Sequence, residues 1–145
     1  MGVKSRVLQN KVNPVRLLCA DQYPSFSFRY LTKNRSYNFG YFSDDRSRML
    51  SCEGLICRMQ ELSTEPWVAL LQKGKAVGIE MIDYSRLNFS APEEAKLNAD
   101  SKVYVIRFDT YHGAKDGRII GFKESPCSVL NIIGFDFDFS AYDHG

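Results

Sequence analysis

The chain has 145 residues, of which 44% are hydrophobic and 25% are charged, and its formal net charge is +2. These values are typical of one globular domain and exclude a largely disordered chain. No apolar run is long enough to span a membrane, and the first residues, MGVKSRVLQN, lack the apolar stretch of a secretory signal. We therefore expect a cytoplasmic protein that does not contact membranes.

The N-terminal segment is basic. Its lysines and arginines have no acidic counterpart before Asp21, and Pro14 would interrupt a long helix. We expect residues 1–22 to form a basic N-terminal arm or a short helix, followed by a single domain over residues 23–145. The basic first third of the chain is the electrostatic feature that indicates an anionic partner.

Aromatic and polar side chains alternate after the arm. Two runs with an aromatic residue at every second position, FSFRY and YNFGY, flank the polar turn TKNR. This pattern predicts an N-terminal β-hairpin with one aromatic face. The other face carries Arg29, Lys33 and Arg35, which we expect to hold an RNA backbone or a protein partner. Tyr37 or Tyr41 would then stack on a base.

Two helices are predicted after the hairpin. The first begins at Ser43-Asp44-Asp45, whose side chains can cap it. Its predicted core stripe consists of Met49, Cys52, Ile56, Met59 and Ser63, with Leu55 and Leu62 beside it. Because Gly54 weakens a helix by about 1 kcal/mol relative to alanine, we expect close packing or another compensating feature there. The segment STEPWVALLQKG predicts a second helix, joined tightly to the first as a helical hairpin.

The C-terminal half is rich in strands. A short strand begins at Val77, and VYVIRFDT, GRIIGFKES and SVLNIIGFDFDF follow, separated by short segments that favour turns. This spacing predicts an antiparallel meander of three to four strands. The whole chain is therefore expected to have an α+β fold. In that fold an antiparallel sheet, made of the N-terminal hairpin and the meander, carries the helical hairpin on one face.

No standard cofactor or metal signature occurs in the sequence. There are four cysteines without a CxxC pair, two histidines, and no glycine-rich phosphate loop, GxSxG or HExxH motif. Asp136 and Asp138 alternate with three phenylalanines in the last strand, which predicts an outward acidic face and an inward aromatic face. Two such carboxylates could contribute to a Mg²⁺ site, but an outward polar face explains them without one. We predict neither a metal nor a cofactor.

Residues 101–145 hold side chains suited to cleaving RNA without a metal. This reaction needs a base, an acid, and cations that stabilise the charge on the phosphorane. The candidate catalytic residues are Arg107, His112, Arg118, Lys123, Tyr142 and His144. On the predicted meander Lys123 points away from Arg118, so only a bulge would bring all the cations together. The alternative is that the cations on the strands face outward and pair with nearby acids.

The C-terminal part of the chain resembles the RelE/ParE-type toxins of toxin–antitoxin systems over residues 45–144. The residues that carry this resemblance are the strand GRIIGF and the ending DFDFSAYDH, placed after a helical hairpin. It implies an RNA-cleaving or target-binding sheet, site residues at Arg118, Tyr142 and His144, and a cognate antitoxin as partner. The chain departs from that family where Asp136 and Asp138 stand in place of a basic residue before the tyrosine. The ending also resembles small uncharacterised proteins of mobile elements.

Two functions are favoured by these patterns. The first is a metal-independent endoribonuclease toxin, in which the cations stabilise phosphate charge and Tyr142 moves protons with His112 or His144. The second is a non-enzymatic immunity or antitoxin-like protein that neutralises a partner through an acidic surface. That surface would consist of Glu93, Glu94, Asp136, Asp138 and Asp143. A small-ligand-binding or phage accessory domain is a third reading.

Overall fold

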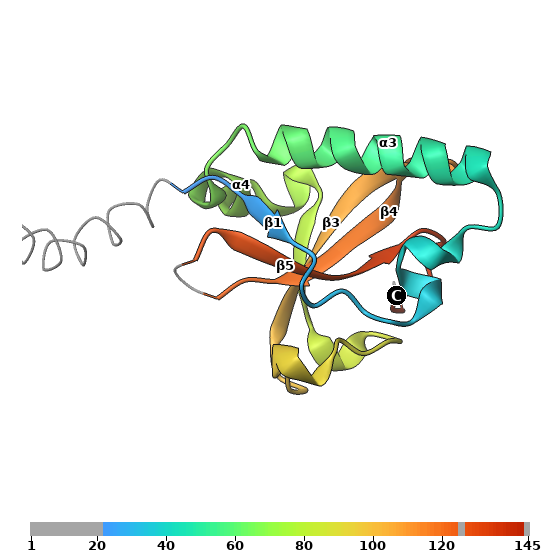
Figure 1. Ribbon diagram of the computed structural model, residues 1–145. Coiled ribbons are helices and arrows are strands. Elements are labelled where there is room, and N and C mark those ends of the chain that lie inside the picture. The colour runs from blue at the N-terminus through green and yellow to red at the C-terminus, as the bar shows by residue number, and fades with distance from the viewer. Residues whose placement is uncertain (1–21, 125–126, 144–145) are drawn as a thin grey trace, which may run out of the picture.

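The computed structural model describes residues 22–124 and 127–143. Two α-helices, α3 (Asp45–Leu62) and α4 (Trp67–Lys73), accompany a twisted sheet (Figure 1). The strands are β1 (Ser25–Ser27), β2 (Ile79–Asp83), β3 (Lys102–Thr110), β4 (Gly113–Phe122) and β5 (Val129–Asp136). Short 3₁₀ turns are η1 (Arg35–Tyr37), η2 (Phe39–Tyr41), η3 (Gly74–Val77), η4 (Tyr84–Arg86) and η5 (Glu93–Ala95). The α+β class predicted from the sequence is confirmed.

The sheet has the strand order β1-β5-β4-β3-β2. Strands β2 to β5 pair with their sequence neighbours in antiparallel fashion, so the predicted meander of three to four strands is confirmed, with four strands. Strand β1 pairs with β5 in parallel. The sheet is therefore mixed, and the prediction of a purely antiparallel sheet is wrong.

The predicted N-terminal hairpin is wrong as well. Only three residues form β1, and the second aromatic run forms the turns η1 and η2. Two asparagine side chains cap these turns, since Asn34 accepts a hydrogen bond from the Ser36 N–H and Asn38 accepts one from the Gly40 N–H. Asparagine side chains that bond to nearby backbone in this way compete with a strand ladder. The segment consequently wraps past β5 instead of forming a second strand.

The aromatic rings of this segment separate to opposite sides of the sheet. The Phe39 ring centroid lies 4.9 Å from that of Phe135 on the face that α3 covers. The Tyr37 ring stacks on Phe89 at 4.7 Å on the opposite face. A hairpin with one aromatic face could not place rings on both sides of the sheet. The aromatic residues alternate here because they pack into two cores, and not because they line one face of a strand.

Helix α3 begins where the sequence predicts it. The Asp44 carboxylate accepts a hydrogen bond of 2.8 Å from the Ser47 N–H and caps the helix. The helix approaches β3 closely at Gly54, where an added Cβ would lie 2.0 Å from the Asp109 carbonyl oxygen. Beside it, the buried Ser51 hydroxyl accepts a hydrogen bond from the Tyr111 N–H. The close packing expected at Gly54 is confirmed.

This close approach changes which side of α3 is buried. The buried residues are Ser51, Leu55 and Leu62. Met49 and Ile56, which the sequence places in the core stripe, are 59% and 61% exposed. The predicted stripe is right for Leu55, Leu62 and Met59, which pack in the core, and wrong for Met49 and Ile56, because the helix turns its Ser51 and Gly54 side toward the sheet.

Both faces of the sheet are covered. Beneath α3 and α4 the core contains Leu55, Leu62, Trp67, Leu70, Ile106, Phe108, Ile119, Ile132, Phe135 and Phe137, among others. The opposite core contains Tyr37, Ile82, Phe89, Val103, Val105, Ile120, Phe122, Ile133, Ala141 and Tyr142. Irregular chain covers this second core, including the connection between β2 and β3, which lies across the sheet from α3 (Figure 1). In the part of the chain that the structure describes, no helix is long and apolar enough to cross a bilayer.

Candidate functional site

Three of the predicted catalytic residues lie close together on the face opposite α3. Arg107 of β3 is directly opposite Arg118 of β4, and Arg118 is directly opposite Asp136 of β5. Tyr142 belongs to the core of the same face. Its pKa is raised by burial, and a hydrogen bond from Arg118 acts in the opposite direction. Tyr142 therefore does fold back toward Arg118.

The remaining predicted catalytic residues lie elsewhere or outside the described chain. Lys123 reaches the helix-covered side, where its Nζ lies 5.6 Å from the centroid of the Trp67 ring. His112 lies at the turn between β3 and β4, with its ring 4.1 Å from that of Tyr111. His144 lies outside the described residues. A bulge does interrupt the pairing of β4 with β5, but it does not bring Lys123 to Arg118.

Arg118 is held in place by backbone and aromatic contacts. Its side chain donates hydrogen bonds to the carbonyl oxygens of Lys115, at 2.6 Å, and Gly117, at 2.9 Å. The guanidinium carbon lies 4.5 Å from the centroid of the Phe139 ring. Arg118 and Tyr142 are each 5% exposed. In this arrangement both side chains support the fold, and a ligand would reach them only after the chain end moves.

Asp136 is buried, so the predicted outward position of this carboxylate is wrong. Its two oxygens accept hydrogen bonds from the N–H groups of Asp138, Ser140 and Ala141. Burial raises the pKa of Asp136, although these three donors oppose the shift. The prediction fails because this face of the sheet is a second core and not a solvated surface. Asp136 therefore fastens the turn that leads to Tyr142.

The rest of the last strand also differs from its predicted pattern. Phe135 and Phe137 are buried as expected, but Phe139 is 45% exposed because the strand ends at Asp136. Asp138 is exposed and follows the strand. No three His, Cys, Asp or Glu side chains gather in a metal-binding arrangement within residues 22–124 and 127–143.

The predicted RNA- or partner-binding residues of the N-terminal segment are split between surface and core. Arg29, Lys33 and Arg35 are exposed. Tyr37 is buried against Phe89, and Tyr41 is half-buried with its pKa raised by that burial. The cations are thus accessible, whereas the Tyr37 ring already has an aromatic partner.

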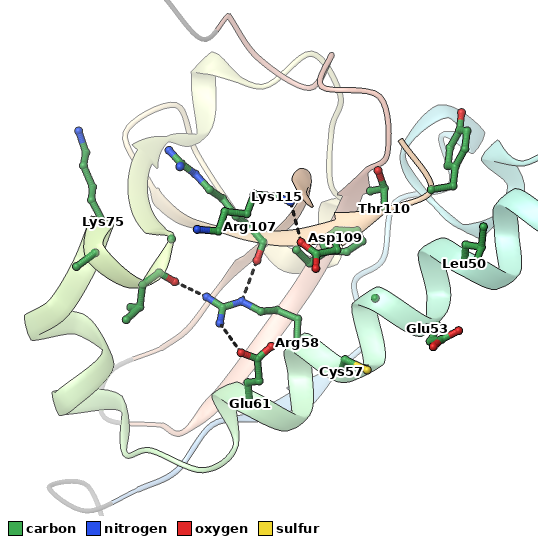
Figure 2. A pocket seen from close by; sticks show the side chains of 16 residues that line it. Leu50, Glu53, Cys57, Arg58, Glu61, Lys75, Arg107, Asp109, Thr110 and Lys115 are labelled. Carbon is green, nitrogen blue, oxygen red and sulfur yellow. Dashed lines mark hydrogen bonds and ion pairs between the residues drawn. The ribbon is translucent and has the colours of Figure 1, made fainter. Parts of the chain in front are cut away.

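A cleft lies between α3 and β3. It has a volume of about 640 Å³ (Figure 2). Its walls come from α3, from η3 and from the ends of β3 and β4. The charged residues that line it are Glu53, Arg58, Glu61, Lys75, Arg107, Asp109 and Lys115. Of these, the sequence identified only Arg107 as a candidate site residue.

Arg58 forms the floor of the cleft. It donates hydrogen bonds to the carbonyl oxygens of Arg107, at 2.8 Å, and Val77, and it lies 3.8 Å from Glu61. These bonds reach from α3 to β3 and η3, as Figure 2 shows. With its side chain only 17% exposed, Arg58 joins the elements of the cleft through these charge-assisted bonds.

Lys115 lies at the opposite wall in an unusual backbone conformation. Its φ angle is +64°, which costs a non-glycine residue free energy. The Asp109 carboxylate accepts its N–H at 2.8 Å, and Arg118 donates to its carbonyl oxygen. Two side chains thus hold the Lys115 backbone in place. Arg118 is therefore a positioning residue for a cation of the cleft.

Glu80 joins two further cations at the end of the cleft. Its Oε1 atom lies 3.8 Å from Lys75 Nζ and 3.7 Å from an Arg107 nitrogen. Arg107 also packs over Gly78, where an added Cβ would lie 3.3 Å from the Arg107 Cβ. The three cations Lys75, Arg107 and Lys115, here called the cationic end, all remain at least partly accessible.

An apolar surface adjoins the cleft on α3. We call it the α3 stripe and define it as Met49, Leu50, Ile56 and Cys57, which surround Glu53. All four are exposed, and Leu50 and Cys57 also line the cleft. The sequence does contain a sign of this surface: Gly54 stands among large apolar residues that cannot all lie on the same side of the helix as the glycine. Only one side of a helix can lie against a sheet at a glycine.

Comparison with known proteins gives no relative for this chain. No family model, no curated protein and no solved structure matches it.

Proposed function

We propose that this protein is a non-enzymatic binding protein of the immunity or antitoxin kind, and that it docks a protein partner on the α3 stripe. The observation that carries the proposal is the exposure of Met49 and Ile56, at 59% and 61%, on one side of a well-formed helix. Large apolar side chains that gather on an exposed helix face beside a cleft are typical of protein-binding surfaces.

The geometry favours this surface over the acidic one predicted from the sequence. Asp136 is buried and bonded to the backbone, which removes it from any contact surface. The other predicted acids, Glu93, Glu94, Asp138 and Asp143, remain exposed. The α3 stripe offers apolar area and an adjoining cleft, and buried apolar anchors supply most of the affinity in protein interfaces.

A metal-independent ribonuclease toxin of the RelE/ParE type is the second candidate. It is favoured by one observation, the alignment of Arg107 with Arg118 and the approach of Tyr142 to them. Cleavage by this set would require the chain end to move, because Arg118 and Tyr142 are buried. The two functions therefore predict different outcomes in cells.

The test is expression of the chain alone and together with the products of neighbouring genes. We expect expression alone to leave growth unchanged, purified protein to leave labelled RNA intact, and a neighbouring product to form a stoichiometric complex with it. Ile56→Asp should weaken that complex by about thirtyfold or more. Val68→Asp is the matched control, because Val68 is 53% exposed on α4, away from the stripe.

Growth arrest that is relieved by Arg118→Ala, with cleavage of the RNA, would overturn the binding proposal in favour of the ribonuclease. A complex that survives Ile56→Asp and is lost with Val68→Asp would place the contact on another surface.

A further inference from the structure

The cationic end shares its cleft with Leu50 and Cys57 of the α3 stripe, and the backbone of its Lys115 is bonded to two side chains. We propose that it receives a carboxylate of the protein partner, and that the partner segment along α3 is therefore both acidic and apolar. This inference rests on the proposed function, since it names the chemistry of the partner that the α3 stripe would bind.

The first argument is that the backbone around the cationic end is held in place before any ligand arrives. Arg58 is bonded to two carbonyl oxygens and so joins α3 to β3 and η3. Lys115 is kept in its left-handed conformation by Asp109 and Arg118. A strained residue persists only where its surroundings hold it, and such residues are concentrated at functional sites. Groups that are already positioned lose less entropy when they bind.

The second argument concerns the kind of anion. Four cationic and three acidic side chains line the cleft, and Glu80 lies between Lys75 and Arg107. A polyanion such as RNA would meet repulsion from these acids along its whole length. A single carboxylate needs only the cations nearest to it and can replace Glu80 as their partner. The mixture of charges therefore favours isolated acidic side chains over a phosphate backbone.

The third argument is the position of the α3 stripe. Leu50 lies at one end of the cleft, and Lys75 and Arg107 lie toward the other, as Figure 2 shows. An extended segment laid along α3 would thus place an apolar side chain near Leu50 and an acidic one at the cationic end. A segment without an acidic residue would desolvate those cations without giving them a further carboxylate, which lowers affinity.

A selection from a random peptide library on the immobilised full chain tests the inference. We expect the selected peptides to be enriched in Asp and Glu, close to an apolar residue, relative to the input library. Their affinity should fall by about tenfold in Arg107→Gln and in Lys115→Gln, since each change removes one charged contact. Lys96→Gln, at an exposed cation away from the cleft, is the control and should leave the affinity unchanged.

Several results would overturn the inference. They are a pool without acidic enrichment, no enriched pool at all, affinity that both glutamine variants retain, or an RNA oligonucleotide that binds the cleft more tightly than the selected peptides. Thermal melting of each variant checks that it is folded. If Ile56→Asp weakens binding while the glutamine variants do not, the proposed function stands and only the carboxylate site is wrong. If neither change weakens binding, both proposals are wrong.

Discussion

The face of the sheet beneath α3 and the face opposite it bury similar aliphatic and aromatic side chains, yet different kinds of chain cover them. Two regular helices, which satisfy their own backbone hydrogen bonds, cover the first. Turns and loops cover the second, and their polar groups need other partners. Thr32 donates to the Ser90 carbonyl oxygen, and Asn88 and Tyr37 donate to that of Ser140.

This difference explains why polar residues have different roles on the two sides. On the irregular face, side chains such as Asp136 and Arg118 already form hydrogen bonds with backbone groups. On the helix face the polar side chains at the rim, including Lys75 and Lys115, remain exposed beside the cleft. We therefore expect the polar side chains that can bind a partner to lie at the edge of the helix face. The following substitutions test this difference between the two faces.

The largest effect is expected where α3 meets β3. Gly54→Val would force a side chain into the Asp109 carbonyl oxygen, which an added Cβ would approach to 2.0 Å. We expect the free energy of unfolding to fall by more than about 3 kcal/mol, because overpacking against backbone cannot relax by rotation of a side chain. Urea denaturation measures it, with Glu53→Ala on the exposed side as control. A loss equal to that of the control would contradict the close approach.

A comparable loss is expected on the irregular face. Phe89 is 7% exposed and its ring lies 4.7 Å from that of Tyr37. Phe89→Ala should lower the free energy of unfolding by about 3 kcal/mol, as large cavities do. Tyr23→Ala, at a side chain that is 53% exposed, should change it by less than about 0.5 kcal/mol. Equal values for the two variants in urea denaturation would mean that this face is not a second core.

The carboxylate of Asp136 tests how the irregular face is fastened. Asp136→Asn keeps the size of the side chain but places an amide N–H group against a backbone N–H group. We expect a loss of about 2 kcal/mol, the cost of an unsatisfied buried donor. Asp138→Asn, at an exposed carboxylate, should cost much less. Chemical denaturation of both variants at neutral pH gives the comparison, and similar losses would refute the role of Asp136.

The pH dependence of the same residue gives a smaller and more specific signal. Burial raises the pKa of Asp136 above 3.8, so the folded state holds the proton to higher pH than the unfolded state does. The contribution of Asp136 to stability is then complete below pH 3.8 and declines as the pH rises through the folded-state pKa. The difference in unfolding free energy between wild type and Asp136→Asn should shrink along that rise. A difference that grows with pH would mean that the backbone donors outweigh burial.

The smallest effect on stability is expected on the α3 stripe. Ile56 is 61% exposed, so Ile56→Asp should change the free energy of unfolding by less than about 0.5 kcal/mol. The same change at Leu55, which is 2% exposed on the adjacent buried side, should unfold the protein. Circular dichroism melting of the two variants separates these outcomes. Strong destabilisation by Ile56→Asp would show that the stripe packs inside the molecule.

The meander and the start of α3 could be predicted because their signals are local. Alternating strands joined by short turns, and Asp44 ahead of the helix, are read from neighbouring residues. The path of residues 28–41 could not be predicted from the sequence. Its aromatic rings pack into two cores on opposite faces of the sheet, and these faces exist only once the sheet has folded. For the same reason Asp136 appeared to be an outward residue: period-two alternation does not show that both faces are covered.

The candidate site was predicted only in part. Arg107 was identified from its place in a strand, but Arg58, Lys75 and Lys115 come from separate elements whose approach depends on Gly54. The resemblance to RelE/ParE-type toxins directed attention to Arg118 and Tyr142, which lie together and are buried. The predictions for these residues failed where they depended on which side chains are exposed. Exposure cannot be read from neighbouring residues, because it depends on contacts distant in the chain.

The most direct test of the α3 stripe as a binding surface is the dissociation constant for the product of the neighbouring gene that forms the complex. It should be measured by calorimetry with wild type, Ile56→Asp and Val68→Asp. We expect Ile56→Asp to weaken binding by about thirtyfold or more, the effect of a central interface residue, while Val68→Asp binds like wild type. Equal affinities for wild type and Ile56→Asp, with both proteins folded, would contradict the account.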